Sequence, residues 1–243
     1  DTIHGIAHSV QSFGAHVGAI HRMRGGYESD RWRLMVHDRK TGMTQNLTEA
    51  FDRHVDAITW ARDGKSLYFT AADEGQESTF VVPAAGGSVK LVLKGTFGDL
   101  QAIAGGRVLV ATQASFTFPA EVVRFNVDGT GLSRITTLND SFLSGFGLKP
   151  GESVAYTGAE GRAVQAWIVK PSDFDPARKY PLLVLIHGGP QGGWNDAWSY
   201  RWNPQVFANA GYVVFMPNPR GSIGWGQEFV DDVTGDWGGR AYE

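Results

Sequence analysis

Short apolar runs separated by turn residues dominate the first two thirds of the chain. The runs richest in β-branched and aromatic residues are residues 32–37, 66–70, 79–83, 108–112, 121–127 and 153–157. The segments between them contain dipeptides such as Asp63-Gly64 and Asp128-Gly129, which suit the positive φ angles of hairpin turns. Because helical periodicity is scarce here, the pattern predicts antiparallel β-sheet from residue 31 to residue 163.

Two landmarks in this region repeat at an almost constant spacing. Equivalent apolar positions lie 44 residues apart, at Leu47, Leu91 and Ile135. Turns that precede a strand recur after 42 and 45 residues, at Gly64, Gly106 and Gly151. A period of about 40–45 residues with four short strands is typical of a β-propeller blade. The spacing therefore predicts about three blades, and a β-sandwich with evenly spaced strands is the alternative.

The pattern of apolar and polar residues changes after residue 163. Residues 163–171 predict a strand, and residues 182–190 and 212–221 are apolar strands that each end in a glycine-containing loop. A short helix is expected between the last two, with Asn203 as its N-cap and Gly211 just past its end. Two apolar strands joined by a helix are typical of a parallel α/β sheet whose strands are buried on both faces. Ligand sites in such sheets lie at the carboxyl ends of the strands, where both glycine loops fall.

Composition narrows the possible chemistry. The chain has 243 residues, 42% of them hydrophobic, and a formal net charge of −3, so it predicts a globular protein with no nucleic-acid partner. It has no cysteine, which excludes disulfides, thiolate metal sites and a cysteine nucleophile. No apolar run approaches the roughly 18 residues that span a bilayer, so no membrane association is expected. A homo-oligomer stays possible.

Four histidines near the start of the chain are candidate metal ligands. They are His4, His8, His16 and His21. An i, i+4 pair of histidines on a helix could hold a metal, but no acidic residue lies at a matching spacing and the glycines among these residues argue against a helix. The sequence also contains no phosphate-binding loop and no dinucleotide fingerprint. We therefore expect no metal and no other cofactor.

Three motifs in close succession resemble one enzyme family. They are HGGPQ at residues 187–191, NPRGSIGWGQEF at residues 218–229 and GDWGG at residues 235–239. Following a segment with the propeller period, they resemble the prolyl oligopeptidase family of serine peptidases, especially its acylaminoacyl-peptidase and dipeptidyl-peptidase V-like branch. The resemblance implies a mixed fold, with a partial β-propeller over residues 1–163 and the start of an α/β-hydrolase domain over residues 164–243.

The same resemblance implies a serine-type peptidase that acts on short peptides, with the propeller limiting access to the active site. In this family the nucleophilic serine lies on a G-x-S-x-G turn, and its aspartate and histidine partners follow it along the chain. The chain contains no such turn, since neither Ser199 nor Ser222 has the flanking glycines. We expect a fragment truncated at both ends, with the triad beyond Glu243 and no activity of its own. A catalytically dead binding module and an esterase on the same fold are the alternatives.

What the resemblance assigns to this chain is part of the oxyanion hole. In α/β-hydrolases one backbone donor comes from a glycine loop of the HGG type. The resemblance assigns this donor to the Gly189 N–H, with Gly188 allowing close backbone approach and Pro190 stiffening the turn. It gives His187 the role of supporting the loop through a hydrogen bond, because the catalytic histidine of the family follows the nucleophile.

Three further residues are candidates for the substrate pocket. Trp225 and Trp237 could line it, although lone aromatic residues more often pack in a core. Arg220, together with Asn218, could orient loops near the active site, and a structural salt bridge is at least as good an interpretation of Arg220.

Overall fold

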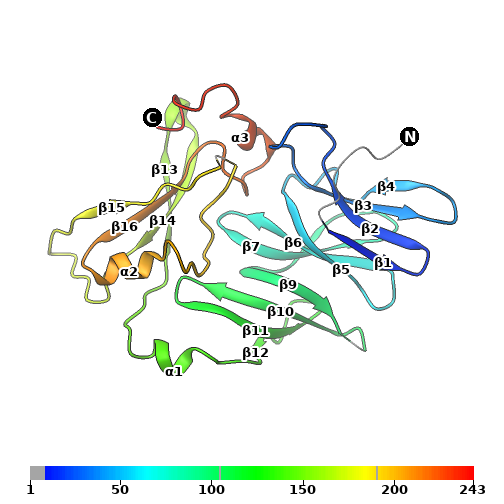
Figure 1. Cartoon of the computed structure of the whole chain (residues 1–243), viewed down its shortest axis with the longest axis horizontal. Helices are drawn as coiled ribbons and strands as arrows, with labels where there is room; N and C mark the ends of the chain where they lie inside the picture. The colour runs from blue at the N-terminus through cyan, green and yellow to red at the C-terminus, as the bar shows by residue number, and fades with distance from the viewer. Residues whose placement is uncertain (1–8, 104, 190) are drawn as a thin grey trace.

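The computed structural model describes residues 9–103, 105–189 and 191–243, and within them the chain forms four sheets of four strands each (Figure 1). The first sheet contains β1 (Val10–Phe13), β2 (His16–His21), β3 (Arg33–Asp38) and β4 (Thr44–Asn46). The second contains β5 (Val55–Trp60), β6 (Ser66–Asp73), β7 (Gln76–Pro83) and β8 (Lys90–Leu93). The third contains β9 (Thr96–Ala102), β10 (Val108–Ser115), β11 (Phe118–Asn126) and β12 (Ser133–Arg134). Each of the three is an antiparallel meander in chain order.

Neighbouring sheets share their apolar cores. One core joins the first two sheets, and its buried residues include Ile20 and Leu34 from the first sheet with Leu67 and Phe69 from the second. The sheets approach so closely that a Cβ at Gly18 would lie 2.8 Å from a Leu67 methyl group. A second core joins Tyr68 of β6 to the third sheet. Each sheet therefore buries its apolar face against the next, as the repeat predicted.

The apolar landmarks of the repeat mark the last strand of each meander. Leu47 directly follows β4, Leu91 lies in β8, and Ile135 directly follows β12. The prediction that Gly151 marks a third repeat of the same kind is wrong, however. Gly151 precedes β13 (Glu152–Thr157), which pairs with β14 (Ala163–Val169) in the fourth sheet. The strand predicted at residues 153–157 therefore does not belong to the repeat. Gly151 follows Gly106 at the spacing of the repeat, but the strand after it pairs in the fourth sheet.

The fourth sheet has the order β13-β14-β16-β15, with β15 (Leu182–Val184) and β16 (Val213–Asn218) running parallel as predicted. Helix α2 (Pro204–Asn209) connects them. Its start follows the expected chemistry, since the Asn203 side chain accepts a hydrogen bond from the Gln205 N–H at 2.9 Å. Gly211 has a φ of +97° just past the end, which favours glycine over other residues.

The expectation that both strands are buried on two faces is wrong for β15. This strand forms the edge of the sheet, where Leu182 is 62% exposed and Val184 is 44% exposed. In β16, by contrast, Val214 and Met216 are buried against Ala208 of α2. Among the described residues, α2 is the only α-helix that contributes a residue to this core. The apolar side chains of β15 therefore stay largely exposed.

Three further short elements complete the described chain. They are helix α1 (Asp140–Leu143), the 3-10 turn η1 (Ala159–Gly161) and helix α3 (Gln227–Asp231). Within the described part of the chain, no helix has the length and apolar character needed to cross a membrane.

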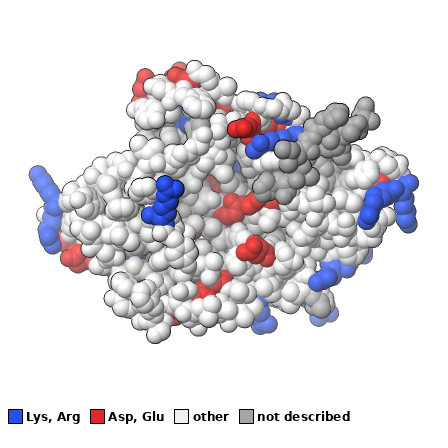
Figure 2. Space-filling model, in the orientation of Figure 1, with Lys and Arg blue, Asp and Glu red and all other residues white. Residues whose placement is uncertain are grey.

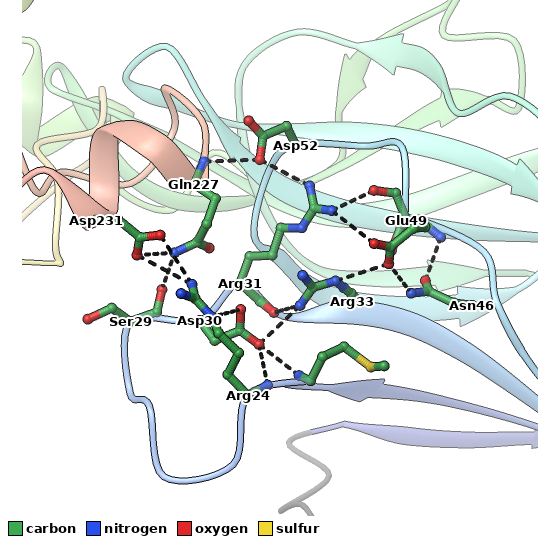
Figure 3. Close-up of polar contacts among 12 residues, drawn as sticks. Arg24, Ser29, Asp30, Arg31, Arg33, Asn46, Glu49, Asp52, Gln227 and Asp231 are labelled. Atoms are coloured by element: carbon green, nitrogen blue, oxygen red, sulfur yellow. Dashed lines mark hydrogen bonds and ion pairs between the residues drawn. The ribbon is translucent and has the colours of Figure 1, made fainter.

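Helix α3 joins the two ends of the chain through a polar network (Figure 3). Asp231 accepts hydrogen bonds from the Tyr27 hydroxyl at 2.8 Å and from Arg24 at 3.3 Å, and the Gln227 N–H donates to Asp52 at 3.0 Å. The network continues to the fully buried Asp30, which accepts hydrogen bonds from two main-chain N–H groups at 2.7 and 2.9 Å and pairs with Arg24 at 3.0 Å. These contacts fasten the segment after β16 to the loop between β2 and β3.

Candidate functional site

A pocket of about 300 Å³ lies at the carboxyl end of β15 and β16. The first wall is the glycine loop, with His187, Gly188 and Gly189, and the second is the segment after α3, with Val233 and Trp237. The remaining lining residues are Tyr156, Ile186, Pro217, Pro219, Ala241 and Tyr242. The lining is mostly apolar, and the glycine loop with His187 supplies polar groups, which is the usual character of a small-molecule site.

Gly189 has a conformation that requires glycine. Its φ is +141°, and a Cβ built on it would lie 2.6 Å from the nitrogen of Gln191 and 2.7 Å from that of Gly192. Both are backbone atoms, so the clash could be relieved only by moving the loop. Gly188 differs, since no described atom lies within 4 Å of a Cβ at that position. Pro190, expected to stiffen the turn, lies outside the described residues.

His187 contacts both glycine loops. Its Nε2 lies 2.9 Å from the Ser222 hydroxyl, which belongs to the loop after β16, and its Nδ1 lies 3.1 Å from the Gly188 carbonyl. Burial lowers the pKa of His187, partly offset by the hydrogen bond to Gly188. The ring is therefore mostly neutral at pH 7, and its two nitrogens lie within hydrogen-bond distance of the Ser222 hydroxyl and the Gly188 carbonyl. His187 thus contacts both its own loop and the loop after β16, and its role in supporting the loop stays a prediction.

The proximity of Ser222 to His187 does not make the pair a nucleophile and its base. Ser222 is 0% exposed, and its hydroxyl also lies 2.6 Å from the Pro219 carbonyl, an acceptor that competes for its proton. A substrate carbonyl cannot approach a hydroxyl that the protein covers completely. Ser199 is also unsuitable, because its oxygen caps the main-chain N–H groups of Arg201 and Trp202 at 3.3 and 2.9 Å.

Asn218, at the end of β16, holds the loop that follows β15. Its side-chain oxygen accepts a hydrogen bond from the Trp194 N–H at 2.6 Å, and its amide group donates to the Trp194 carbonyl at 3.0 Å and to Gln165 at 2.7 Å. The Ile223 N–H donates to the Gly192 carbonyl at 2.9 Å. With the His187–Ser222 bond, these contacts fasten the two glycine loops to each other at several points.

The structure brings only one of the three expected pocket side chains to the pocket. Trp237 lines it and is 68% exposed. Trp225 packs against Phe229, with ring centroids 6.0 Å apart. Arg220 is buried and forms ion pairs with Glu160 and Asp232, each at 3.2 Å. The position of Arg220 thus matches the alternative of a structural salt bridge.

Sequence reasoning missed several pocket residues. Tyr156 is one of them, because the spacing assigns residues 153–157 to the repeat, whereas β13 belongs to the same sheet as the two strands that precede the glycine loops. Val233 and Tyr242 come from turns that follow α3 and carry no periodic pattern. The sequence marks Ser222 only as a serine without the flanking glycines of a nucleophile, and its place in the loop after Asn218 is the one signal that points to a partner for His187.

Among the residues that the structure describes, no group of three or more His, Asp or Glu side chains has the geometry to hold a metal ion. His4 and His8 lie outside the described residues. His16 and His21 begin and end the strand β2, which is not a helix. The chemistry available at the site is therefore that of backbone donors, a neutral imidazole and an apolar wall.

Comparison with solved structures shows that the chain shares its fold with part of two peptidases. It superimposes on the acylaminoacyl peptidase of Pyrococcus horikoshii with a TM-score of 0.79 and 22% sequence identity, covering 94% of this chain and 35% of that one. It also matches dipeptidyl peptidase 4 of Porphyromonas gingivalis with a TM-score of 0.67 and 21% identity, covering 92% and 32% of the two chains. The chain thus has the mostly β-sheet fold of part of these peptidases.

Sequence comparisons identify the family. Residues 198–243 match the model of the prolyl oligopeptidase family. Dipeptidyl-peptidase 5 of Schizosaccharomyces pombe is 36% identical over 237 residues, covering 95% of this chain and 34% of the relative. Dipeptidyl-peptidase 5 of Trichophyton schoenleinii is 38% identical over 226 residues, covering 89% and 31%. The resemblance to the prolyl oligopeptidase family is thereby confirmed, and the chain spans about a third of the length of these relatives.

Proposed function

We propose that this chain is part of a serine peptidase that acts on short peptides and that it supplies one donor of the oxyanion hole. The observation that carries the proposal is the glycine loop, in which Gly189 has a glycine-only backbone and lines a pocket at the end of a parallel strand. The family match and the dipeptidyl-peptidase 5 relatives support the reaction class. A peptide-like ligand is also known for the fold, since an acylaminoacyl peptidase has been solved with Z-Gly-Gly-Phe-chloromethyl ketone.

In this proposal the three meanders are consecutive propeller blades and the fourth sheet begins the α/β-hydrolase domain. The shared cores between neighbouring sheets support the first part, and the parallel pair β15 and β16 supports the second. Strand pairing favours a boundary near residue 150, one hairpin earlier than the expected 163, because β13 pairs with β14.

The Gly189 N–H would act on the developing oxyanion. When a nucleophile attacks a peptide carbonyl, the oxygen gains negative charge, and a fixed N–H donor lowers the barrier by about 2.7–4 kcal/mol. Among the described residues, no acceptor takes a hydrogen bond from this N–H, so it is available to a ligand. His187 holds the loop in place through Ser222 and takes no proton from the nucleophile. The nucleophile, aspartate and histidine of the triad are expected beyond Glu243.

The test uses the product of the intact gene. A fluorophosphonate probe should label a single serine outside residues 1–243, and Gly189→Ala should lower kcat/KM for a short peptide substrate by about 100-fold or more. Gly25→Ala is the matched control, because Gly25 has no described atom within 4 Å of its Cβ position and lies outside the pocket. Peptide hydrolysis without probe labelling would overturn the serine mechanism. Absence of both would favour the binding module, and preference for esters would favour the esterase.

A further inference from the structure

One residue of the segment between β15 and α2 binds turns of both the second and the third sheet. The Asp196 N–H donates a hydrogen bond to the Gly75 carbonyl at 2.8 Å, and Gly75 lies in the turn between β6 and β7. The Asp196 carboxylate accepts a hydrogen bond from the Phe116 N–H, also at 2.8 Å, in the turn between β10 and β11. The segment that begins with the glycine loop is therefore fastened to two sheets of the repeat at Asp196.

The turn between β6 and β7 also holds the second glycine loop, the one that follows β16. The Glu74 N–H donates a hydrogen bond to the Gly224 carbonyl at 3.2 Å. Two neighbouring residues of one turn, Glu74 and Gly75, thus bind both glycine loops. A Cβ at Gly75 would lie 2.9 Å from the indole nitrogen of Trp167, so the turn lies directly against the fourth sheet.

The donor to the Asp196 carboxylate is fixed as well. Phe116 is fully buried, and its ring packs in the core of the fourth sheet with its centroid 5.4 Å from that of Trp167. A Cβ at Gly151 would lie 2.6 Å from an atom of the Phe116 ring. Because the ring has no room to shift, its main-chain N–H offers Asp196 a fixed point.

The Asp196 carboxylate is held by this hydrogen bond and not by an ion pair. Burial raises the pKa of Asp196, and the hydrogen bond from the Phe116 N–H opposes the shift. Among the ion pairs of the described residues, none includes Asp196. On the face shown in Figure 2, acidic side chains gather toward the middle, whereas most of the visible lysines and arginines lie nearer the rim. A partly buried carboxylate is costly unless a donor satisfies it, so the Phe116 N–H decides where this side chain lies.

We propose that Asp196 is a positioning residue for the Gly189 N–H, which it places by fixing the segment after the glycine loop to the second and third sheets. The inference rests on the proposed peptidase function and deepens it. Asp196 follows Gly189 by seven residues, and the segment between them is held at Gly192 by the loop after β16 and at Trp194 by Asn218. A shift at Asp196 therefore reaches the oxyanion donor, where a displacement of about 1 Å can cost about 100-fold in rate.

Kinetics of the intact gene product test this role. Asp196→Ala removes the acceptor of the Phe116 N–H, and we expect kcat for a short peptide to fall at least tenfold while KM changes less than threefold, because an oxyanion donor acts mainly in the transition state. Asp196→Asn keeps an acceptor oxygen, so both constants should stay within threefold of those of the unchanged protein. Ser199→Ala is the matched control and should leave kcat and KM unchanged, because Ser199 lies in the same segment and accepts hydrogen bonds only from main-chain N–H groups of its own loop.

A double-mutant cycle shows whether Asp196 acts through Gly189. If it does, Asp196→Ala should lower kcat less than twofold further when Gly189→Ala is already present. A further tenfold loss in that background would overturn the proposal. So would a kcat within twofold of normal in Asp196→Ala alone, or equal losses in Asp196→Ala and Asp196→Asn.

Hydrogen exchange tests the same placement without catalysis. The amides of residue 196 and Ile223 donate to the Gly75 and Gly192 carbonyls, and both should exchange at least tenfold faster in Asp196→Ala than in the unchanged protein. Gly75→Ala displaces the same turn, should have the same effect, and is the second variant if Asp196→Ala fails to fold. Unchanged exchange in both variants would overturn the role of Asp196. Absence of peptide hydrolysis in the unchanged protein would overturn the peptidase function, and the exchange rates would still decide whether Asp196 fixes the loop.

Discussion

Asn218 offers the sharpest test of how the glycine loop is held. Asn218→Ala removes three hydrogen bonds and leaves the Trp194 N–H without its acceptor, while the Trp194 carbonyl keeps the Trp167 indole N–H at 3.0 Å. Gln165 is only partly buried, so water can replace the lost bond there. Net hydrogen bonds contribute about 0.5–1.5 kcal/mol each, and an orphaned buried N–H costs about 1–3 kcal/mol. The expected loss is therefore about 2–4 kcal/mol.

Two measurements test the expected loss of stability in Asn218→Ala and show whether it arises at the glycine loop. Urea unfolding gives the change in the free energy of unfolding, and hydrogen exchange at the Trp194 amide reports whether the loop opens locally. Asn209→Ala is the control, because Asn209 is exposed on α2 and donates only to the Gln205 carbonyl at 3.0 Å; it should change stability by less than about 0.5 kcal/mol. A loss below about 1 kcal/mol in Asn218→Ala, with the Trp194 amide as protected as before, would refute the role given to Asn218.

Two further predictions concern the sheets. Leu67→Ala should destabilise the chain by about 2–5 kcal/mol in urea unfolding, because Leu67 is fully buried where β6 meets β2; a loss under about 1 kcal/mol would contradict the shared core. A hydrogen bond from Thr136 is the main cause that lowers the pKa of Glu121 to about 2. Its stabilising effect is complete above the ordinary pKa of 4.5 and is lost as pH falls toward 2, so Glu121→Gln should flatten the decline in stability between these values. An unchanged acid profile would contradict this.

The sequence was most informative where local chemistry alone decides the structure. The α2 helix was predicted with its cap, because an asparagine before a proline and a glycine after the last turn stabilise a helix in almost any surroundings. The 44-residue spacing predicted a repeat, and its three apolar landmarks fall in or directly after the last strand of each meander.

It was least informative where the outcome depends on which segments meet. Residues 152–157 have the composition of a meander strand, but their partner is β14, and strand pairing of this kind leaves no trace in spacing. The apolar run at β15 correctly predicted a strand, but it wrongly predicted that the strand is buried on both faces, because burial depends on what covers the sheet. For the same reason, the pocket residues Tyr156 and Val233 could not be grouped with His187 before the sheet was known.

Arg220 shows how a residue can affect the pocket without lining it. Its guanidinium pairs with Asp232, and Asp232 directly follows Asp231, which bonds Tyr27 in the loop between β2 and β3. The next residue, Val233, is part of the pocket wall. This wall is therefore held from both sides, by Arg220 toward the fourth sheet and by Tyr27 toward the first. Because the first sheet and the fourth sheet meet through this short segment, the shape of the Gly189 pocket depends on how the two parts of the chain are fastened together.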